Sequence, residues 1–127
     1  MTIAFEPPIP VLRIFSVEKA REFYVDFLGF EIAWEHRFEE GLPLYCEVRR
    51  GTLKLHLSEH HGDASPGSTI VLWMTGIDAF QAELLTKQYR YARPGVEPTP
   101  WGARMMEIAD PFGNRLRFMT REPTIEA

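Results

Sequence analysis

A pattern of an apolar strand followed directly by a helix occurs twice in this chain, about sixty residues apart. Residues 11–18 form the first copy, and residues 71–78 repeat it in the same order. Each half then closes on a further apolar strand, at 53–57 and at 116–119. A repeat of this length indicates two copies of one supersecondary unit that bury their apolar faces against each other. It also matches each residue of one half with a partner in the other half.

Length and composition favour a single soluble domain over residues 1–127. The 45% hydrophobic and 25% charged residues are typical of a globular protein of this size. The net charge of −4 argues against nucleic acid as a partner, because nucleic acid requires a basic surface. No apolar stretch approaches the roughly 18 residues of a membrane span, and the N-terminus lacks a secretory signal. With Cys46 as the single cysteine, a reducing cytoplasmic location is expected.

The first unit is expected over about residues 8–60, behind a short extended arm at 2–8 that contains two prolines. Ser16 is a typical N-cap, and Gly29 stands where a helix C-cap glycine is expected. These two residues bound a helix with one apolar stripe. The predicted strands of this unit are 9–15, 30–38, 44–49 and 52–58.

The second unit is expected over about residues 67–121, after a linker at 60–68 that is rich in turn-forming residues. Its helix is predicted over 77–88, with Leu84 and Leu85 on the apolar face. The proline-rich stretch 93–100 is predicted as a loop and 110–114 as a tight turn, and the tail after Thr120 is expected to fray. The predicted strands are 69–74, 105–109 and 115–119. The resulting β-α-β-β-β order, present twice, defines an α+β fold with helices on one side of each sheet.

This order, together with three motifs, resembles the glyoxalase, bleomycin-resistance and extradiol dioxygenase superfamily, which has the vicinal oxygen chelate fold. The motifs are 23–24 (Phe-Tyr), 27–30 (Phe-Leu-Gly-Phe) and 110–114 (Asp-Pro-Phe-Gly-Asn), and the resemblance covers about residues 8–120. Ile-Pro-Val-Leu at 9–12 and Pro-Trp-Gly at 100–102 look most like the bleomycin-binding resistance proteins. The resemblance implies paired modules whose curved sheets form a concave cleft. It also implies a homodimer in which the arm crosses to the partner subunit, and drug sequestration without catalysis.

The resemblance further implies where a metal would bind, because enzymes of this superfamily place His, Glu or Gln ligands on the first and last strands of each unit. The matching positions here hold Ile9, His56, Thr69 and Arg117. Only His56 is a good ligand for a divalent metal, and Arg117 places a permanent cation where the metal's charge would lie. Without a metal, the enzymatic chemistry of the superfamily lacks its electrophile. We therefore expect no metal site, no cofactor and no catalytic residue.

Two other groups of residues have alternative interpretations. His56, Glu59, His60 and His61 could gather around a metal, but neighbouring residues of an extended chain point in opposite directions, which favours a solvated turn. Cys46 lacks an identified base and is interpreted as a small buried apolar residue.

Charged residues along the predicted strands bear on the ligand. An acidic stretch along two of these strands is either a solvated rim or an electronegative cleft edge that attracts a basic ligand; it contains Glu31, Glu35, Glu39, Glu40 and Glu47. The first three share a face if their strand is regular. Three arginines oppose this reading if they face inward, and they would favour a mixed or anionic ligand. They are Arg13, Arg104 and Arg117.

Aromatic residues lie outside the helical stripes and favour a flat conjugated ligand, because stacking adds affinity without requiring many polar contacts. Strand alternation places Thr69, Val71 and Trp73 on the concave face. The alternative is that several aromatic residues close the core or a dimer interface. The predicted ligand-binding residues are Trp34, Phe38, Tyr45, His56, Trp73, Trp101 and Arg117.

The favoured hypothesis is non-catalytic binding of a bleomycin-type antibiotic by a homodimer, with any copper arriving in the drug's own ligands. Two alternatives stay open: a metal-dependent lyase, isomerase or dioxygenase, and a binder of another small aromatic ligand. A shared fold does not choose between them.

Overall fold

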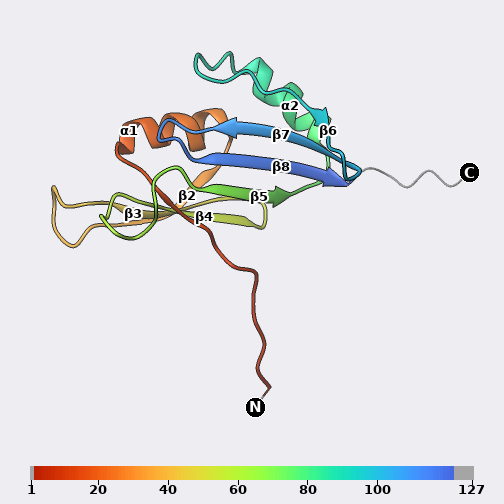
Figure 1. Ribbon diagram of the computed structural model, residues 1–127. Coiled ribbons are helices and arrows are strands. Elements are labelled where there is room, and N and C mark those ends of the chain that lie inside the picture. The colour runs from red at the N-terminus through yellow and green to blue at the C-terminus, as the bar shows by residue number, and fades with distance from the viewer. Residues whose placement is uncertain (1, 122–127) are drawn as a thin grey trace, which may run out of the picture.

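Two four-stranded sheets, with the helices on one side of each, make up the computed structural model, which describes residues 2–121 (Figure 1). The first unit contains β1 (Val11–Arg13), α1 (Val17–Ala20), η1 (Arg21–Phe27), β2 (Glu31–His36), β3 (Tyr45–Arg50) and β4 (Leu53–Ser58). The second contains β5 (Thr69–Trp73), α2 (Ile77–Thr86), β6 (Glu97–Pro98), β7 (Ala103–Ala109) and β8 (Arg115–Arg121). The predicted α+β architecture of two similar units is confirmed.

The repeat extends to strand pairing. The sheet orders are β1-β4-β3-β2 and β5-β8-β7-β6, so in both units the first strand lies beside the last one. These first-to-last pairs are parallel, and the remaining pairs are antiparallel. Val11 lies opposite His56 in the first unit, and Val71 lies opposite Arg117 in the second.

The first helix begins as expected but changes type. The Ser16 hydroxyl accepts a hydrogen bond from the Lys19 backbone N–H at 3.2 Å, which is the N-cap interaction. After one turn of α1 the chain continues as the π-helix η1, which buries Phe23, Tyr24 and Phe27. Gly29 ends it with a φ of 77°, in the left-handed region that glycine adopts without strain. The apolar spacing did not reveal the π-helix, because the same residues face inward in either type of helix.

Several predicted boundaries were wrong at strand and helix ends. The strand predicted over 30–38 ends at His36, which leaves Phe38 in a loop. The helix predicted to reach Gln88 ends at Thr86, and Leu85 is 50% exposed although Leu84 is buried. The loop predicted over 93–100 contains the short edge strand β6, a position where a proline is tolerated because one side of the strand is unpaired. β1 is shorter than predicted, β7 and β8 are longer, and the tail at 122–127 lies outside the described residues.

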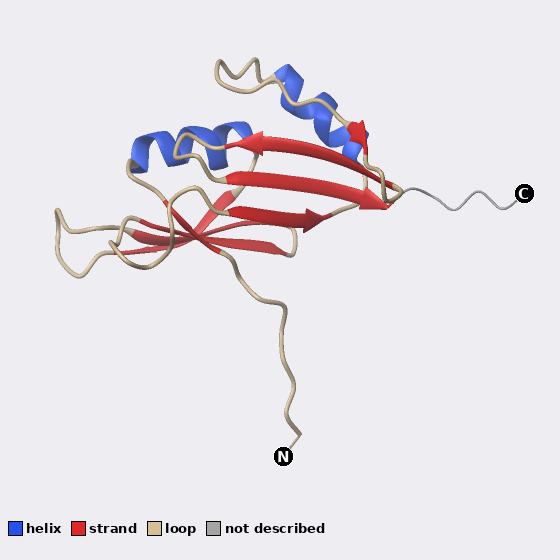
Figure 2. Cartoon of the chain, viewed as in Figure 1, coloured by secondary structure: helices blue, strands red, loops and turns tan. Residues whose placement is uncertain are grey.

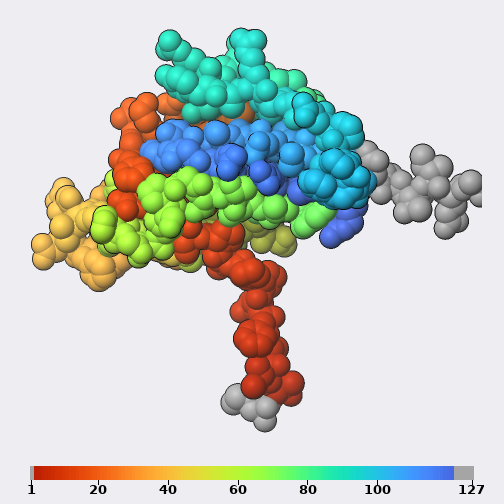
Figure 3. All heavy atoms as spheres, in the orientation of Figure 1, coloured from red at the N-terminus to blue at the C-terminus, as the bar shows by residue number. Residues whose placement is uncertain are grey.

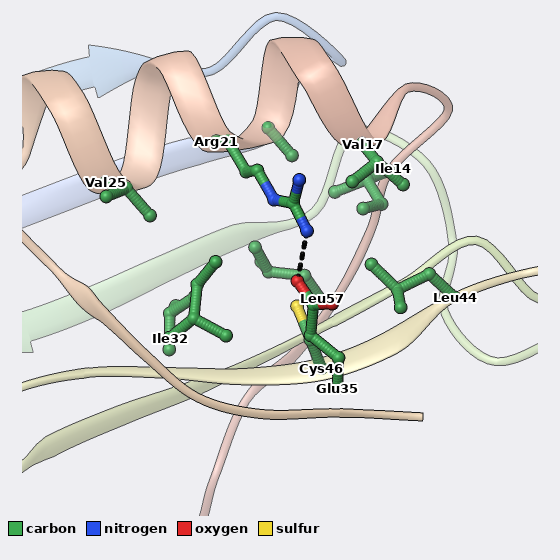
Figure 4. Close-up of a pocket in the computed structure, with 11 residues that line it drawn as sticks. Ile14, Val17, Arg21, Val25, Ile32, Glu35, Leu44, Cys46 and Leu57 are labelled. Carbon is green, nitrogen blue, oxygen red and sulfur yellow. Dashed lines mark hydrogen bonds and ion pairs between the residues drawn. The ribbon is translucent and has the colours of Figure 1, made fainter. Parts of the chain in front are cut away.

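An irregularity in β2 decides which side chains reach the open face of the first sheet. The pairing of β2 with β3 shifts between Ile32 and Trp34, as in a β-bulge. Consequently Trp34 lies on the open face, whereas Glu35 points toward the helices and forms an ion pair with Arg21 (Figure 4). Glu31 and Glu35 therefore do not share a face, and the acidic strip expected for a regular strand does not form.

A buried polar cluster joins the two units. The Asp110 carboxylate accepts hydrogen bonds from the Tyr24 hydroxyl at 2.7 Å and from the backbone and side-chain N–H groups of Asn114, both at 2.8 Å. The Asn114 side chain also donates to the Arg13 carbonyl at 2.9 Å and accepts from the Ser68 N–H at 3.1 Å. Burial, and then the Asp110 charge, raise the pKa of Tyr24 well above its usual value, so its hydroxyl remains a donor. We call Tyr24, Asp110 and Asn114 the junction cluster.

The N-terminal arm extends away from the body of the molecule (Figures 2 and 3). Its side chains contact little of their own chain, and Phe5 is 95% exposed. Among residues 2–121, no helix has the length and apolar character needed to cross a membrane.

We expect Tyr24→Phe to lower the free energy of unfolding by about 1–3 kcal/mol, because it leaves the buried Asp110 carboxylate short of one donor. Urea unfolding followed by circular dichroism measures this change. Tyr91→Phe, at an exposed tyrosine, is the matched control and should change stability by less than about 0.5 kcal/mol. Equal effects of the two substitutions would contradict a central role for the junction cluster.

Candidate functional site

The open face of the first sheet carries a compact group of side chains. On β3 and β4, Cys46 and Leu57 are buried toward the helices, so the alternate residues Tyr45, Glu47 and His56 point the other way. Glu47 lies opposite His56 on β4 and opposite Trp34 on β2. The bulge in β2 and the short β3–β4 connection thus bring four polar or aromatic side chains together.

Hydrogen bonds connect three of these side chains in a line. The Tyr45 hydroxyl lies 2.6 Å from His56 Nδ1, and His56 Nε2 lies 3.0 Å from Glu47 Oε1. Glu47 is buried and His56 is partly buried. Burial, followed by the charges of Asp63 and Cys46, raises the pKa of Tyr45, so its hydroxyl keeps its proton at neutral pH.

Trp34 forms an aromatic surface beside this line. Its ring stacks on Tyr45 with the centroids 5.9 Å apart and the planes 11° apart. It also meets His56 edge-on at 5.3 Å. Trp34 is 43% exposed, so part of it remains available to a flat ligand. We call Trp34, Tyr45, Glu47 and His56 the first-sheet cluster.

Phe38 lies beyond this cluster, in the loop after β2, and is 75% exposed. It contacts the rings of His36 at 4.9 Å and His60 at 6.1 Å. The Glu59 side chain does not join these rings, because its carboxylate accepts a hydrogen bond from the Leu44 backbone N–H at 2.9 Å. Within residues 2–121, no three His, Cys, Asp or Glu side chains are grouped so that they could hold a metal ion.

The open face of the second sheet carries the remaining strand residues that were predicted to bind ligand. The guanidinium of Arg121 lies 4.0 Å from the centre of the Trp73 ring, a cation–π contact. Arg117 donates to Glu107 at 3.0 Å. Arg104 instead points to the helix side, where it forms two hydrogen bonds with Asp78 on α2 and lowers the pKa of that carboxyl group. Among the arginines whose charge could oppose a basic ligand, Arg117 therefore lies on the open face and Arg104 does not.

The seven predicted residues do not meet in one place within a single chain. Trp34, Tyr45 and His56 gather on the first sheet, with Phe38 at its end. Trp73 and Arg117 lie on the second sheet. Trp101 lies in the turn before β7 and is 66% exposed.

The residues at the positions of the superfamily's metal ligands do not fit a metal. The Ile9 side chain has no atom that can bind a metal, and the Thr69 side chain offers only a hydroxyl. Arg117 is a cation already paired with Glu107. His56 uses both ring nitrogens in hydrogen bonds to Tyr45 and Glu47, so neither is left for coordination.

Two hollows lie beside the helices, and Trp73 contributes to the wall of the larger one. The one between α1, η1 and the first sheet, where Arg21 pairs with Glu35, has a volume of about 10 Å³ (Figure 4). This is no larger than one water needs. Burial raises the pKa of the Cys46 thiol at this hollow to about 11, which makes it a poor nucleophile.

A larger groove of about 640 Å³ lies between the β3–β4 turn and α2. Phe30, Phe80 and Phe118 contribute to its walls. The Arg50 guanidinium crosses it to the Glu83 carboxylate, with bonds of 2.7 and 2.9 Å. No local pattern in the sequence relates these two residues, and the sequence analysis missed both.

The sequence placed Glu47 in an acidic stretch but not among the ligand-binding residues, although a signal for its pairing with His56 exists. If Gly51 and Thr52 are taken as a two-residue hairpin turn, counting outward pairs Arg50 with Leu53 and then Glu47 with His56, as observed. Arg121 was missed because the last strand was predicted to end at Met119.

Comparisons with known proteins agree with this fold. A family model described as glyoxalase superfamily protein matches residues 1–124, and the chain belongs to this superfamily. The bleomycin-binding protein of bleomycin-producing Streptomyces verticillus, solved with copper(II)-bleomycin, is 30% identical, with a TM-score of 0.70 over 97% of this chain and 100% of that chain. No curated protein matches the chain.

Two further structures share the fold. A bleomycin resistance determinant encoded on the transposon Tn5 is 24% identical, with a TM-score of 0.73 over 94% of this chain and 100% of that one. A glyoxalase family protein from Enterococcus faecalis is 18% identical, with a TM-score of 0.69 over 90% of this chain and 96% of that one. The fold is therefore shared by bleomycin resistance proteins and by glyoxalase family proteins.

We expect added Zn²⁺ or Ni²⁺ to leave the thermal unfolding midpoint of the protein unchanged. A ligand stabilises a protein only by binding its folded state, and the four positions described above do not fit a metal. Differential scanning fluorimetry with and without a chelator measures this. His56→Ala is the control, since the partly buried His60 and the exposed His61 remain in it. A metal-induced rise in the midpoint that disappears in His56→Ala would contradict our assignment.

Proposed function

We propose that this protein binds a flat, conjugated antibiotic of the bleomycin type and sequesters it without converting it. The observation that carries the proposal is the stacked Trp34–Tyr45 pair on an open sheet face, beside the buried carboxylate of Glu47. The 30% identity, over nearly the whole chain, to a protein solved with copper(II)-bleomycin supports it further.

Stacking and charge would act together in such a site. An aromatic pair contributes about 0.5–1.5 kcal/mol beyond the area that it buries, so tight binding requires several contacts. The Glu47 carboxylate attracts a basic group, while Arg117 and Arg121 suit carbonyl or carboxylate groups. Copper would enter with the drug, held by the drug's own ligands.

A homodimer would complete the site, because the seven candidate residues of one chain lie in separate places. In this arrangement the first-sheet cluster of one protomer faces Trp73, Arg117 and Trp101 of its partner. The exposed apolar side chains of Ile3 and Phe5 favour an arm that crosses to the partner subunit. We also propose that the two modules act as one domain. The protein would work in the cytoplasm, where Cys46 stays a free thiol.

Titration of the metal-stripped protein with bleomycin, by tryptophan fluorescence and calorimetry, tests the proposal. We expect saturation near about one drug per chain, with sub-micromolar affinity. Trp34→Ala and Trp101→Ala should each weaken binding on the order of 10-fold, since each removes an aromatic contact. Tyr91→Ala, at an exposed aromatic residue elsewhere, is the matched control. Absence of binding would overturn the drug assignment and leave the fold untouched.

We expect removal of residues 2–8 to shift the protein from dimer to monomer at low micromolar concentration, because it removes the crossing contacts. Sedimentation velocity over a concentration series measures the shift. Phe5→Ser should act in the same direction, and Tyr91→Ser is its control. A dimer of unchanged stability in the shortened chain would show that the arm does not hold the protomers together.

A further inference from the structure

The line of hydrogen bonds through His56 has a direction. A carboxylate can only accept hydrogen bonds, so the ring nitrogen 3.0 Å from Glu47, Nε2, carries a hydrogen. In a neutral imidazole the other nitrogen, Nδ1, then has a lone pair and accepts. With His56 as a neutral imidazole, the Tyr45 hydroxyl, 2.6 Å from Nδ1, is the donor of that bond.

This direction determines what Tyr45 presents to a ligand. Its single hydroxyl hydrogen is used within the line, so the oxygen offers only lone pairs to the open face. The Trp34 ring lies nearly parallel to the Tyr45 ring and is 43% exposed, so the aromatic surface available to a planar molecule adjoins the Tyr45 side chain.

We propose that the first-sheet cluster selects planar heteroaromatic ligands that carry an N–H donor at the ring edge, which Tyr45 Oη accepts while the ring contacts Trp34. The inference rests on the proposed function, because that function places a ligand on Trp34. It adds that the ligand has to present a hydrogen-bond donor to Tyr45. A ligand with an acceptor at the same place meets the Tyr45 lone pairs and is repelled, which makes Tyr45 a specificity-determining residue.

One substitution of nearly the same shape removes the constraint that sets this polarity. In Glu47→Gln the side-chain amide can either accept the hydrogen of His56 Nε2 or donate to Nε2, so the ring hydrogen is no longer confined to Nε2. When the hydrogen moves to Nδ1, Nδ1 donates to Tyr45 and the tyrosine hydroxyl turns its own hydrogen outward. Tyr45→Phe removes the acceptor altogether. Glu31→Gln removes the same charge from an exposed position of the same sheet, opposite Arg49, and serves as the matched control.

The test uses indole and N-methylindole, two planar probes that differ by one N–H donor. Each is titrated into the wild type and the three variants and followed by proton–nitrogen correlation spectra of the Trp34 indole. We expect wild type and Glu31→Gln to bind indole roughly 3- to 10-fold more tightly than N-methylindole, the usual effect of one hydrogen bond. The preference should vanish in Tyr45→Phe and become smaller in Glu47→Gln.

Long-range proton–nitrogen spectra of the histidines give a readout without any ligand. We expect His56 to carry its hydrogen on Nε2 in the wild type and to divide it between Nε2 and Nδ1 in Glu47→Gln. A wild-type His56 with its hydrogen on Nδ1, or on both nitrogens, would overturn the inference. Equal binding of the two indoles by the wild type, or no binding of either, would overturn it as well. An intact indole preference without bleomycin binding would instead refute the proposed drug while the selectivity stands.

Discussion

The relative placement of the two units depends on one buried carboxylate. Asp110 receives the Tyr24 hydroxyl from the first unit and the Asn114 amide from its own turn, while Asn114 reaches the Arg13 carbonyl at the end of β1. A buried carboxylate is unfavourable unless several donors satisfy it, so the cluster forms only when the units sit in this one arrangement. The Asp-Pro-Phe-Gly-Asn turn is therefore the element that makes one domain out of two repeats.

This arrangement leaves one face of each sheet uncovered. The helices occupy the inner sides, where Phe80 packs against Phe118 and η1 covers the first sheet. The uncovered faces carry charged side chains and also aromatic ones, including Trp34 and Trp73, that a folded chain otherwise tends to bury. The homodimer proposed above would bring the uncovered face of one sheet opposite that of the partner's other sheet.

Sequence patterns predicted the part of this structure that depends on local periodicity. The repeat, the Ser16 cap and the Gly29 turn follow from spacing alone. The π-helix and the bulge at Ala33 did not, because both change the residue count by one while leaving the apolar pattern intact. The bulge matters most, since it places Trp34 and Glu35 on opposite faces. The Arg50–Glu83 pair depends on how the units meet, which no local pattern encodes.

The central claim is that a conjugated ligand lies on the open sheet faces. The chain has three tryptophans, Trp34, Trp73 and Trp101, and all of them are candidate site residues. Their indole N–H signals in a proton–nitrogen spectrum therefore report directly on the site during a bleomycin titration. The account predicts that the Trp34 and Trp73 signals move together and stop at about one drug per chain. Signals that stay in place, or that drift without saturating, would contradict it.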